Sequence, residues 1–488
     1  MGCAIPNIQD LERTATATRS IRHPTFREIL RMVQNATLES TLKTLVENKR
    51  YSSVKDILVT MNPSDIAAIF DDLTEEQLPI MFRLLPKALA ADSFVEMNTD
   101  NQELLIKGFS DTELKQVLDE MYVDDTVDIV EEMPANVVSR ILKQVTPEKR
   151  RDINEILRYP ENSAGSIMTT EYISLSPKMT VSEAFKRIRE TGVDKETIYT
   201  CYVLSSFNRL LGLVSAKSLM LEKDENATIE SLMQSNVITV NTKMDQEEVA
   251  KTLSKYNFMA LPVVDSEDRM VGIVTFDDAM DVMVQEATED ITIMSGQTPY
   301  ENTYLRTSPW ELFKHRIPWL MILMISATFT GLIITNFESA LAVHVILTAF
   351  IPMLMDTGGN SGSQSSVTII RAISLGEVEF NDIGKVILKE FLTSLMCGLA
   401  LSIACFAKVM LVDGLLFQNA SVTFMVAFSV SLTMCLTVVI AKLIGCTLPL
   451  VAKKIGFDPA VMASPFITTI VDALSLLIYF AIATAILF

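Results

Sequence analysis

The last third of the chain is almost free of charge, and this constrains its fold more than any other feature. From residue 315 to the C-terminus there are only nine acidic and eight basic residues. This region contains five long apolar segments. Each segment approaches or exceeds the roughly 20 residues that a helix needs to cross a bilayer. We therefore expect an all-α membrane domain with spans at residues 317–337, 340–355, 386–412, 422–447 and 459–488. An alternative is that the second span continues through the Gly-rich residues after it.

The preceding residues are acidic. The net charge of −19 falls almost entirely in residues 1–314 of the 488-residue chain, which is long enough for several domains. A negative surface repels phosphates, so nucleic acid is excluded as a partner. The same surface attracts cations, although ordinary acidity for solubility also explains the charge at this point.

Residues 26–160 have apolar residues at helical spacing between proline-marked breaks, whereas residues 1–25 lack periodicity and are expected to be flexible. Residues 63–73 align without gaps with residues 123–133, which predicts a solenoid of short stacked helices. Within the second copy, Asp124, Asp125 and Asp128 crowd one helix start, and the carboxylates at i and i+4 repel each other. A bound cation would relieve this repulsion; a solvated acidic face is the alternative.

Residues 164–276 change to short β-runs and amphipathic helices in the order β-α-β-β-α, which occurs twice. The string at 210–215 corresponds to that at 270–275, about 60 residues later. This tandem α/β arrangement resembles a pair of cystathionine-β-synthase (CBS) domains, at residues 164–225 and 226–276. The resemblance implies a regulatory module that binds ATP or another adenosine nucleotide and has no catalytic residues.

The helix that follows is acidic at both ends, with Asp277, Asp278 and Asp281 first and Glu286, Glu289 and Asp290 last. Acids at a helix C-terminus oppose the helix dipole, so this end favours a nearby cation or base. The helix opens a connecting segment, residues 277–314, that leads to the membrane domain. A solvated linker helix is the alternative.

Asp472 is the single charge in the last apolar segment after residue 461. A carboxylate in hydrocarbon costs roughly 3 kcal/mol or more, so it is either hydrogen-bonded to a neighbouring helix or faces an aqueous cation path. Residues 356–366 are rich in Gly and Ser and are predicted to interrupt a span and line a cavity. Pro465 is expected to free a carbonyl near Asp472, with Thr468 between, and such hard oxygen donors suit Mg²⁺ or Ca²⁺.

Basic residues alternate along the membrane domain, at Arg316, at Arg371 and Lys385, and at Lys453 and Lys454. By the positive-inside rule these loops are cytosolic. We expect a multi-pass protein of the cell membrane with its N-terminus in the cytosol and its C-terminus outside.

Taken together, the chain resembles the MgtE family of magnesium transporters over nearly its whole length. The resemblance is carried by the order of the regions and by short strings, above all Gly-Gly-Asn-Ser-Gly-Ser-Gln at 358–364 and Asp-Pro-Ala at 458–460. It implies a homodimeric, Mg²⁺-selective channel that closes when intracellular Mg²⁺ binds to the acidic cytosolic domains.

The resemblance also implies roles for particular residues. Asp472 would hold the permeating ion. The residues expected to line the path or shape it are Gly358, Gly359, Asn360, Gly362, Gln364, Pro465 and Thr468. The residues expected to bind regulatory Mg²⁺ are Asp124, Asp125, Asp128, Asp245, Glu247, Asp278, Asp281, Glu286, Glu289 and Asp290.

The predicted fold is thus an acidic helical solenoid, a CBS pair and a five-span domain, and the expected partners are a second copy, the bilayer and a divalent cation. Two other functions stay open: transport of Co²⁺ or Mn²⁺, and nucleotide sensing by a membrane-tethered regulatory protein. An enzyme is not expected, since the sequence has no HExxH motif, nucleophile elbow or phosphate-cradling loop.

Overall fold

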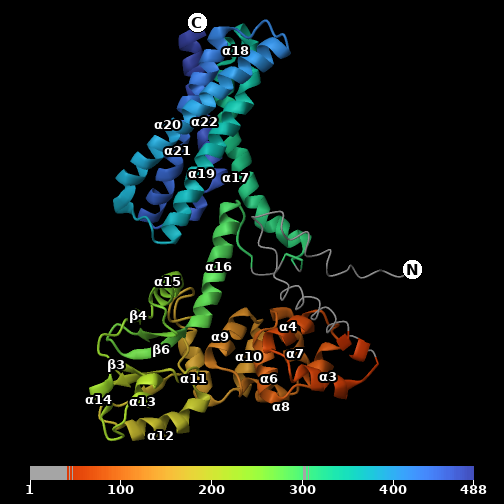
Figure 1. Cartoon of the computed structure of the whole chain (residues 1–488). Coiled ribbons are helices and arrows are strands. Elements are labelled where there is room, and N and C mark those ends of the chain that lie inside the picture. The colour runs from red at the N-terminus through yellow and green to blue at the C-terminus, as the bar shows by residue number, and fades with distance from the viewer. Residues whose placement is uncertain (1–40, 43, 47, 301–303, 306, 488) are drawn as a thin grey trace, which may run out of the picture. The chain divides into compact units, whose positions relative to one another are not determined.

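The computed structural model describes residues 41–42, 44–46, 48–300, 304–305 and 307–487 (Figure 1). These residues fall into two compact units, one ending at Val282 and the other beginning at Met283. The segment predicted to be flexible, residues 1–25, lies outside the described residues.

The first unit opens with a series of short helices. They are α3 (Tyr51–Leu58), α4 (Pro63–Asp71), α5 (Leu78–Phe82), α6 (Lys87–Val95), α7 (Thr99–Gly108), α8 (Asp111–Leu118), α9 (Val123–Glu132), α10 (Ala135–Gln144) and α11 (Pro147–Ile156). Proline begins α4 and α11, where its missing N–H costs nothing, and Ser110 closes a capping box with Glu113 at the start of α8. The aligned stretches at 63–73 and 123–133 form α4 and α9, which confirms the predicted helical domain.

Two similar three-stranded sheets follow. The first contains β1 (Ile173–Leu175), β2 (Thr200–Leu204) and β3 (Leu210–Ser215), with α12 (Val181–Thr191), η1 (Gly192–Asp194) and α13 (Ala216–Leu221). The second contains β4 (Val240–Asn241), β5 (Ala260–Val264) and β6 (Met270–Thr275), with α14 (Ile229–Leu232) and α15 (Gln246–Tyr256). In each sheet the first pair is parallel and the second antiparallel, with Cys201 opposite Val214 and Leu261 opposite Val274. The repeated α/β module is confirmed.

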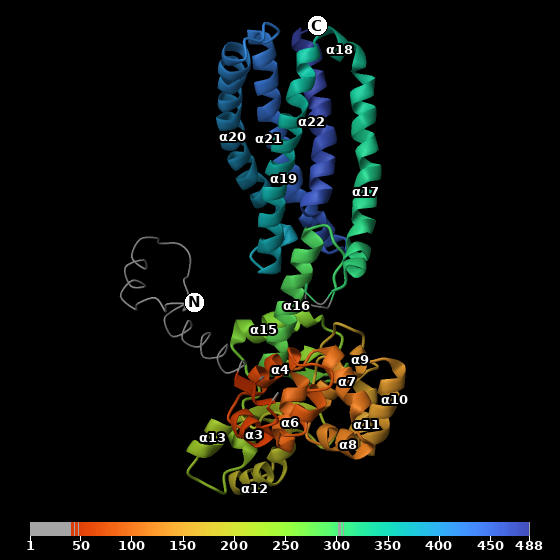
Figure 2. The ribbon, with the colours of Figure 1, turned by 90° about the vertical axis from the view of Figure 1, so that its right-hand side faces the viewer.

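Helix α16 (Phe276–Met294) leaves the second sheet and ends in the second unit. The second unit continues with α17 (Pro309–Asn336), α18 (Glu338–Val343), η2 (Val345–Phe350), α19 (Ile351–Ser374), η3 (Phe380–Asp382), α20 (Ile383–Lys408), η4 (Val409–Leu416), α21 (Phe424–Lys454), η5 (Pro459–Met462) and α22 (Ser464–Leu487). Helix α19 packs on α21 and α22, and α20 packs on α21 (Figure 2).

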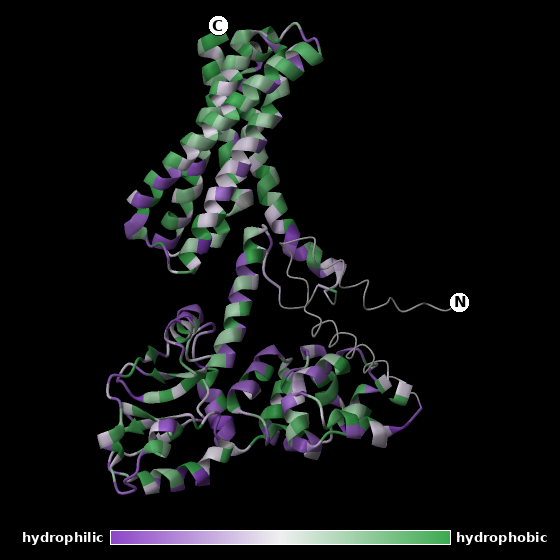
Figure 3. Cartoon of the chain, in the orientation of Figure 1, coloured by the Kyte–Doolittle hydropathy of each residue, from purple (hydrophilic) through white to green (hydrophobic). Residues whose placement is uncertain are grey.

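Four stretches of the described residues are long and apolar enough to cross a membrane: Pro309–Asn336, Phe380–Leu416, Phe424–Lys454 and Pro459–Leu487. The helices of this unit are coloured mainly as hydrophobic, whereas hydrophilic and hydrophobic residues alternate in the first unit (Figure 3). The helical membrane domain is therefore confirmed as a fold class.

The predicted second span, residues 340–355, is wrong in its position. That stretch is divided among α18, η2 and the start of α19. The Gly-rich string does not break a helix, because α19 runs through it from Ile351 to Ser374. Its 24 residues give a length of about 36 Å, enough to cross the hydrocarbon core of a bilayer. The helix is stable in a membrane because its backbone N–H and C=O groups bond to each other within the helix. Its small residues also allow neighbouring helices to pack closely.

Candidate functional site

The glycines of α19 lie on the face that packs on α21 and α22. A Cβ atom added at Gly358 would lie 2.7 Å from Thr437 Cγ2, and one added at Gly359 would lie 2.9 Å from Thr468 Cγ2. At Gly362 the nearest atom, 2.8 Å away, belongs to Ile467. At these three positions a larger side chain would collide with α21 or α22, so the glycines allow the helices to pack closely.

The opposite side of α19 is uncovered and polar. We call it the polar stripe, and its exposed members recur every three or four residues: Asp356, Asn360, Gln364, Thr368 and Arg371. Asn360 Nδ2 donates a hydrogen bond to Asp356 Oδ1 at 3.1 Å, and Thr368 Oγ1 donates one to the carbonyl of Gln364 at 2.7 Å. The stripe therefore presents carboxylate and amide oxygens along one side of a membrane helix.

Asp472 lies in α22, half-buried, near the polar stripe. The Asp356 carboxylate is close enough to repel the Asp472 carboxylate, although the two residues are more than 100 positions apart. The helix contact that brings α22 beside α19 is the one made by Gly358 and Gly359. Asp472 and two predicted path residues, Asn360 and Gln364, are thus on neighbouring helices.

The carbonyl oxygen expected from Pro465 already accepts hydrogen bonds. Pro465 stands in the first turn of α22, where it breaks no intrahelical bond, so the predicted mid-span break is wrong. Its carbonyl accepts hydrogen bonds from Thr468 Oγ1 and Thr469 Oγ1, both at 3.0 Å. A cation beside Asp472 would therefore compete with these hydroxyls for that carbonyl.

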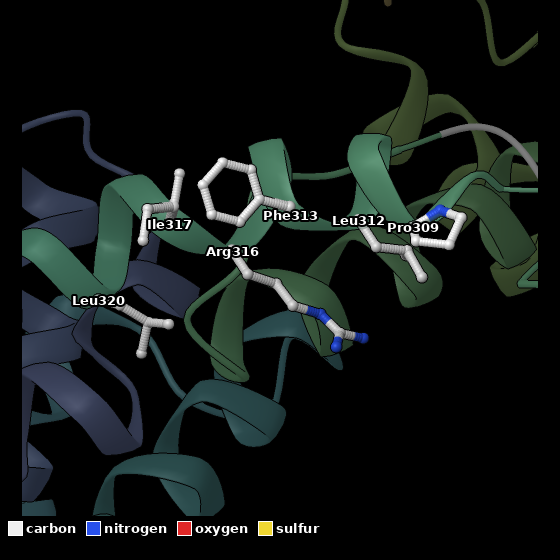
Figure 4. Close-up of a pocket in the computed structure, with 6 residues that line it drawn as sticks. All are labelled: Pro309, Leu312, Phe313, Arg316, Ile317 and Leu320. Carbon is white, nitrogen blue, oxygen red and sulfur yellow. The ribbon is translucent and has the colours of Figure 1, made fainter.

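The uncovered faces of α17 and α20 are mainly apolar. None of the described residues of α17 is buried, and its exposed side chains include Met324, Ile325 and Phe329. A hollow of about 370 Å³ along the start of α17 is lined by five apolar residues and Arg316 and contains no carboxylate (Figure 4). Such surfaces suit lipid, whereas the polar stripe does not.

A second set of carboxylates gathers in the first unit, where the start of α9 meets the first CBS module and the start of α16. We call it the acid cluster: Asp124, Asp125, Asp128, Glu171, Glu196, Asp277 and Asp278. Lys149 attracts Asp124 and Asp125, but its Nζ donates to the carbonyl of Leu118 at 2.8 Å. Negative charge therefore exceeds positive charge in this region.

Burial and repulsion by neighbouring carboxylates raise the pKa values of three members of the acid cluster, Asp124, Glu196 and Asp278. Burial, together with repulsion by Asp278, raises the pKa of Asp124 well above its ordinary value. The same two causes raise the pKa of Glu196 to about 8. Burial raises the pKa of Asp278 to about 6, although the Thr275 hydroxyl donates to its carboxylate at 2.6 Å.

Two carboxylate oxygens of the acid cluster are buried and have no hydrogen-bond partner, Asp124 Oδ1 and Glu196 Oε2. A buried polar atom without a partner costs about 1–3 kcal/mol, and hard oxygens of this kind fit Mg²⁺. Among the described residues, however, no three His, Cys, Asp or Glu side chains are arranged to hold a metal ion in this conformation. The residues fit the cation chemically, but a metal site would require them to move closer together.

The remaining predicted regulatory residues are spread along the chain. Asp245 caps α15 by accepting from Glu247 N at 2.9 Å, and Glu247 pairs with Lys251 at 2.6 Å. Asp281 and Glu289 are exposed on α16. In the second unit, Asp290 accepts a hydrogen bond from Ser374 Oγ at 3.3 Å, whereas Glu286 lies one turn before it on α16.

Glu171 and Glu196 were missed by the sequence analysis. Glu171 accepts a hydrogen bond from the first backbone N–H of α9, Val123 N, at 3.0 Å. Neither residue lies in an acidic run or at a helix start, so no local signal distinguishes it. Only the tertiary contact between α9 and the first CBS module places Glu196 near Asp124 and Glu171 near Asp125.

Three family models match the chain: the MgtE intracellular N domain at residues 61–162, the CBS domain at 164–224 and 229–285, and the MgtE divalent cation transporter at 351–482. The chain is 34% identical to the magnesium transporter MgtE of Thermus thermophilus over 89% of its own length and 95% of the relative's. It is 31% identical to the Bacillus subtilis protein of the same name, over 93% and 99%.

Among solved structures, the cytosolic domain of the Mg²⁺ channel MgtE in complex with ATP matches half of the chain and 99% of that domain, with 33% identity and a TM-score of 0.48. Both relatives are named as magnesium transporters, and each match covers nearly the whole length of both chains. The chain belongs to the MgtE family of divalent cation transporters.

Proposed function

We propose that this chain carries Mg²⁺ across the cell membrane through a path between two copies, with Asp472 of each copy at the ion. The observation that carries the proposal is the polar stripe of α19 beside Asp472, whereas the exposed side chains along α17 and α20 are mainly apolar. A charged side chain facing lipid is costly, so the stripe needs water or another protein surface opposite it.

A second copy meets this need. In a two-fold dimer the same surface of each copy faces the axis, so two polar stripes and two Asp472 carboxylates would enclose one path. Mg²⁺ gives up its water reluctantly, and we expect the carboxylates to bind a largely hydrated ion. Hard oxygen ligands favour Mg²⁺ over softer transition metals such as Co²⁺.

The acid cluster would act as the sensor of intracellular Mg²⁺. Bound Mg²⁺ would neutralise the repulsion among Asp124, Asp278 and Glu196 and draw α9, the CBS pair and α16 together. Because the ion would bind the compact arrangement better than the open one, rising Mg²⁺ would favour closure. Asp245, Glu247 and the acids at the end of α16 would extend the sensor, and adenosine nucleotide at the CBS pair would add a second input.

The orientation follows from the basic residues. Arg371, Lys385, Lys453 and Lys454 lie at the ends of α19, α20 and α21, which face the same side if consecutive helices alternate in direction. We infer that this side is cytosolic, with the N-terminus inside and the C-terminus outside.

The test is Mg²⁺ flux into proteoliposomes that contain the full chain. We expect Asp472→Asn to reduce flux at least tenfold, because the neutral amide loses the charge-assisted attraction for the ion. Asp382→Asn is the matched control, since Asp382 is an acid at a helix end that pairs with exposed Lys385 at 2.7 Å. Equal flux through wild type and Asp472→Asn would overturn the proposal.

A further inference from the structure

Three polar side chains from three membrane helices meet on the packed side of α19. Ser365 Oγ donates a hydrogen bond to Glu390 Oε2 of α20 at 2.6 Å. Lys442 Nζ of α21 donates to the same Ser365 Oγ at 3.5 Å. Lys442 is 6% exposed and Ser365 is 2% exposed, so the connection lies inside the helix bundle.

The link between Glu390, Ser365 and Lys442 faces other helices, so it can fix the position of α19. A buried ammonium is expensive in a membrane domain, and such charges are kept where they are paired or functional. The Lys442 ammonium is linked to Glu390 through the Ser365 hydroxyl, and fixing one arrangement among several is the best-attested use of such buried polar groups. The arrangement that Ser365 can fix is the rotation of α19 about its own axis.

The helix crossing next to this link is made by two glycines, which have no side chains to fix that rotation. A Cβ atom added at Gly445 of α21 would lie 2.2 Å from the carbonyl oxygen of Gly362, so the two backbones nearly touch. Two glycines give close approach but no side chain that locks one helix against the other. Ser365 and Lys442 each stand three residues, about one turn, from this crossing.

We propose that Glu390, Ser365 and Lys442 are positioning residues that fix the rotation of α19 and thereby aim the polar stripe into the cation path. Ser365 lies about 140° around the helix from the centre of the Asp356–Gln364 segment, given 100° per residue. A bond that holds Ser365 toward α20 and α21 therefore holds the stripe away from them. The inference rests on the proposed function, because only a path beside α19 gives this rotation a consequence.

The first test compares ion flux in proteoliposomes of the full chain. Lys442→Met should lower Mg²⁺ flux at least tenfold and lower the ratio of Mg²⁺ to K⁺ flux, since it removes the donor that joins Ser365 to α21. Lys442→Arg should restore both values to within about twofold, because it keeps the charge and the donor. Lys385→Met is the matched control, as Lys385 pairs with Asp382 at an exposed helix end.

A double variant separates positioning from charge balance. Glu390→Gln with Lys442→Met removes both charges and leaves no unpaired one, so the bundle can fold. Positioning predicts that flux stays low in the double variant. Recovery to wild-type flux would assign the pair to charge balance alone and overturn the inference.

The second test reads the rotation directly. In a background without native cysteines, Asn360→Cys should react with a water-soluble thiol reagent, whereas Ile369→Cys on the packed side should not. Adding Lys442→Met should reduce the difference between the two sites at least tenfold. An unchanged difference overturns the inference even if flux falls.

The two proposals fail in different ways. If wild-type flux depends on Asp472 but Lys442→Met matches wild type in flux, ion ratio and cysteine reactivity, the positioning inference fails alone. If no flux depends on Asp472, the proposed function fails, and the cysteine reactivities still decide whether α19 is held by this link.

Discussion

The acid cluster and the surroundings of Asp472 use the same side chain under opposite conditions. In the first unit several carboxylates crowd together, and two of their buried oxygens lack a hydrogen-bond partner. In the second unit Asp472 has one nearby carboxylate, Asp356, and lies beside a polar stripe that is not covered. The carboxylates of the acid cluster repel one another, whereas the surroundings of Asp472 allow a charged group to be hydrated.

This difference suits two different tasks. A sensor must change shape when an ion binds, so repulsion that the ion relieves is useful. A permeation site must bind weakly enough for the ion to leave, so few ligands and a hydrated ion are useful. The comparison predicts that substitutions in the acid cluster alter stability and Mg²⁺ response, whereas substitutions near Asp472 alter flux.

The largest effect on stability is expected where α19 and α21 nearly touch, because an added side chain has no room there. Gly445→Ala would set a Cβ atom 2.2 Å from the Gly362 carbonyl oxygen. We expect a loss of about 3 kcal/mol, the upper part of the usual range for overpacking. Thermal unfolding of the full chain in detergent measures this. Gly331→Ala is the control, since nothing lies within 4 Å of its Cβ position; equal melting temperatures for the two variants would contradict the packing argument.

A smaller effect of opposite sign is expected in the acid cluster. Asp124→Asn removes a buried charge and supplies donors to neighbouring carboxylates, so it should stabilise the Mg²⁺-free chain by about 1–2 kcal/mol. The same variant should lose most of the stabilisation that added Mg²⁺ gives to wild type. Melting temperatures with and without Mg²⁺ test both statements, with exposed Asp119→Asn as control. An undiminished Mg²⁺ effect in Asp124→Asn would remove Asp124 from the sensor.

The sequence was sufficient for much of this arrangement. Hydrophobic segments predicted a helical membrane domain, the two β-α-β-β strings predicted the CBS pair, and the aligned repeats at 63–73 and 123–133 predicted α4 and α9. These elements are set by local periodicity and by strings that are close together in the chain, which is the information that a single sequence carries.

Features that depend on contacts between distant segments were missed. The string at 356–366 was expected to break a helix because Gly and Ser are poor helix formers, yet packing on α21 and α22 overrides that preference. Glu171 and Glu196 join the acid cluster only through the contact between α9 and the CBS module. The link from Ser365 to Glu390 and Lys442 joins three helices, and the spacing of residues within any one helix does not predict it.

The pH dependence of stability gives a further test of the acid cluster. The pKa of Glu196 is raised to about 8 from an ordinary value of 4.5, so the folded chain holds a proton that the unfolded chain has lost between these values. The stability of the Mg²⁺-free chain should therefore fall as pH rises from about 4.5 to 8. Melting temperatures across this range should fall less steeply for Glu196→Gln than for wild type, with Glu190→Gln, an exposed acid on α12, as control. Parallel curves for Glu196→Gln and wild type would show that Glu196 does not titrate in this way.

The smallest effect is expected at Glu247, where the two explanations of an acidic residue can be separated. Glu247 pairs with Lys251 one turn later on α15, and both side chains are partly exposed. An exposed pair at this spacing contributes about 0.3–0.5 kcal/mol.

If Glu247 serves only in this ion pair, Glu247→Gln and Lys251→Met should lower stability equally and leave the Mg²⁺ response unchanged. If Glu247 also binds Mg²⁺, only Glu247→Gln should raise the Mg²⁺ concentration that half-closes the channel, because Lys251→Met keeps the carboxylate and removes a competing cation. Protection of the first unit from protease over a Mg²⁺ titration would distinguish the two. A shift shared by both variants would mean that the ion pair, rather than the carboxylate alone, sets the response.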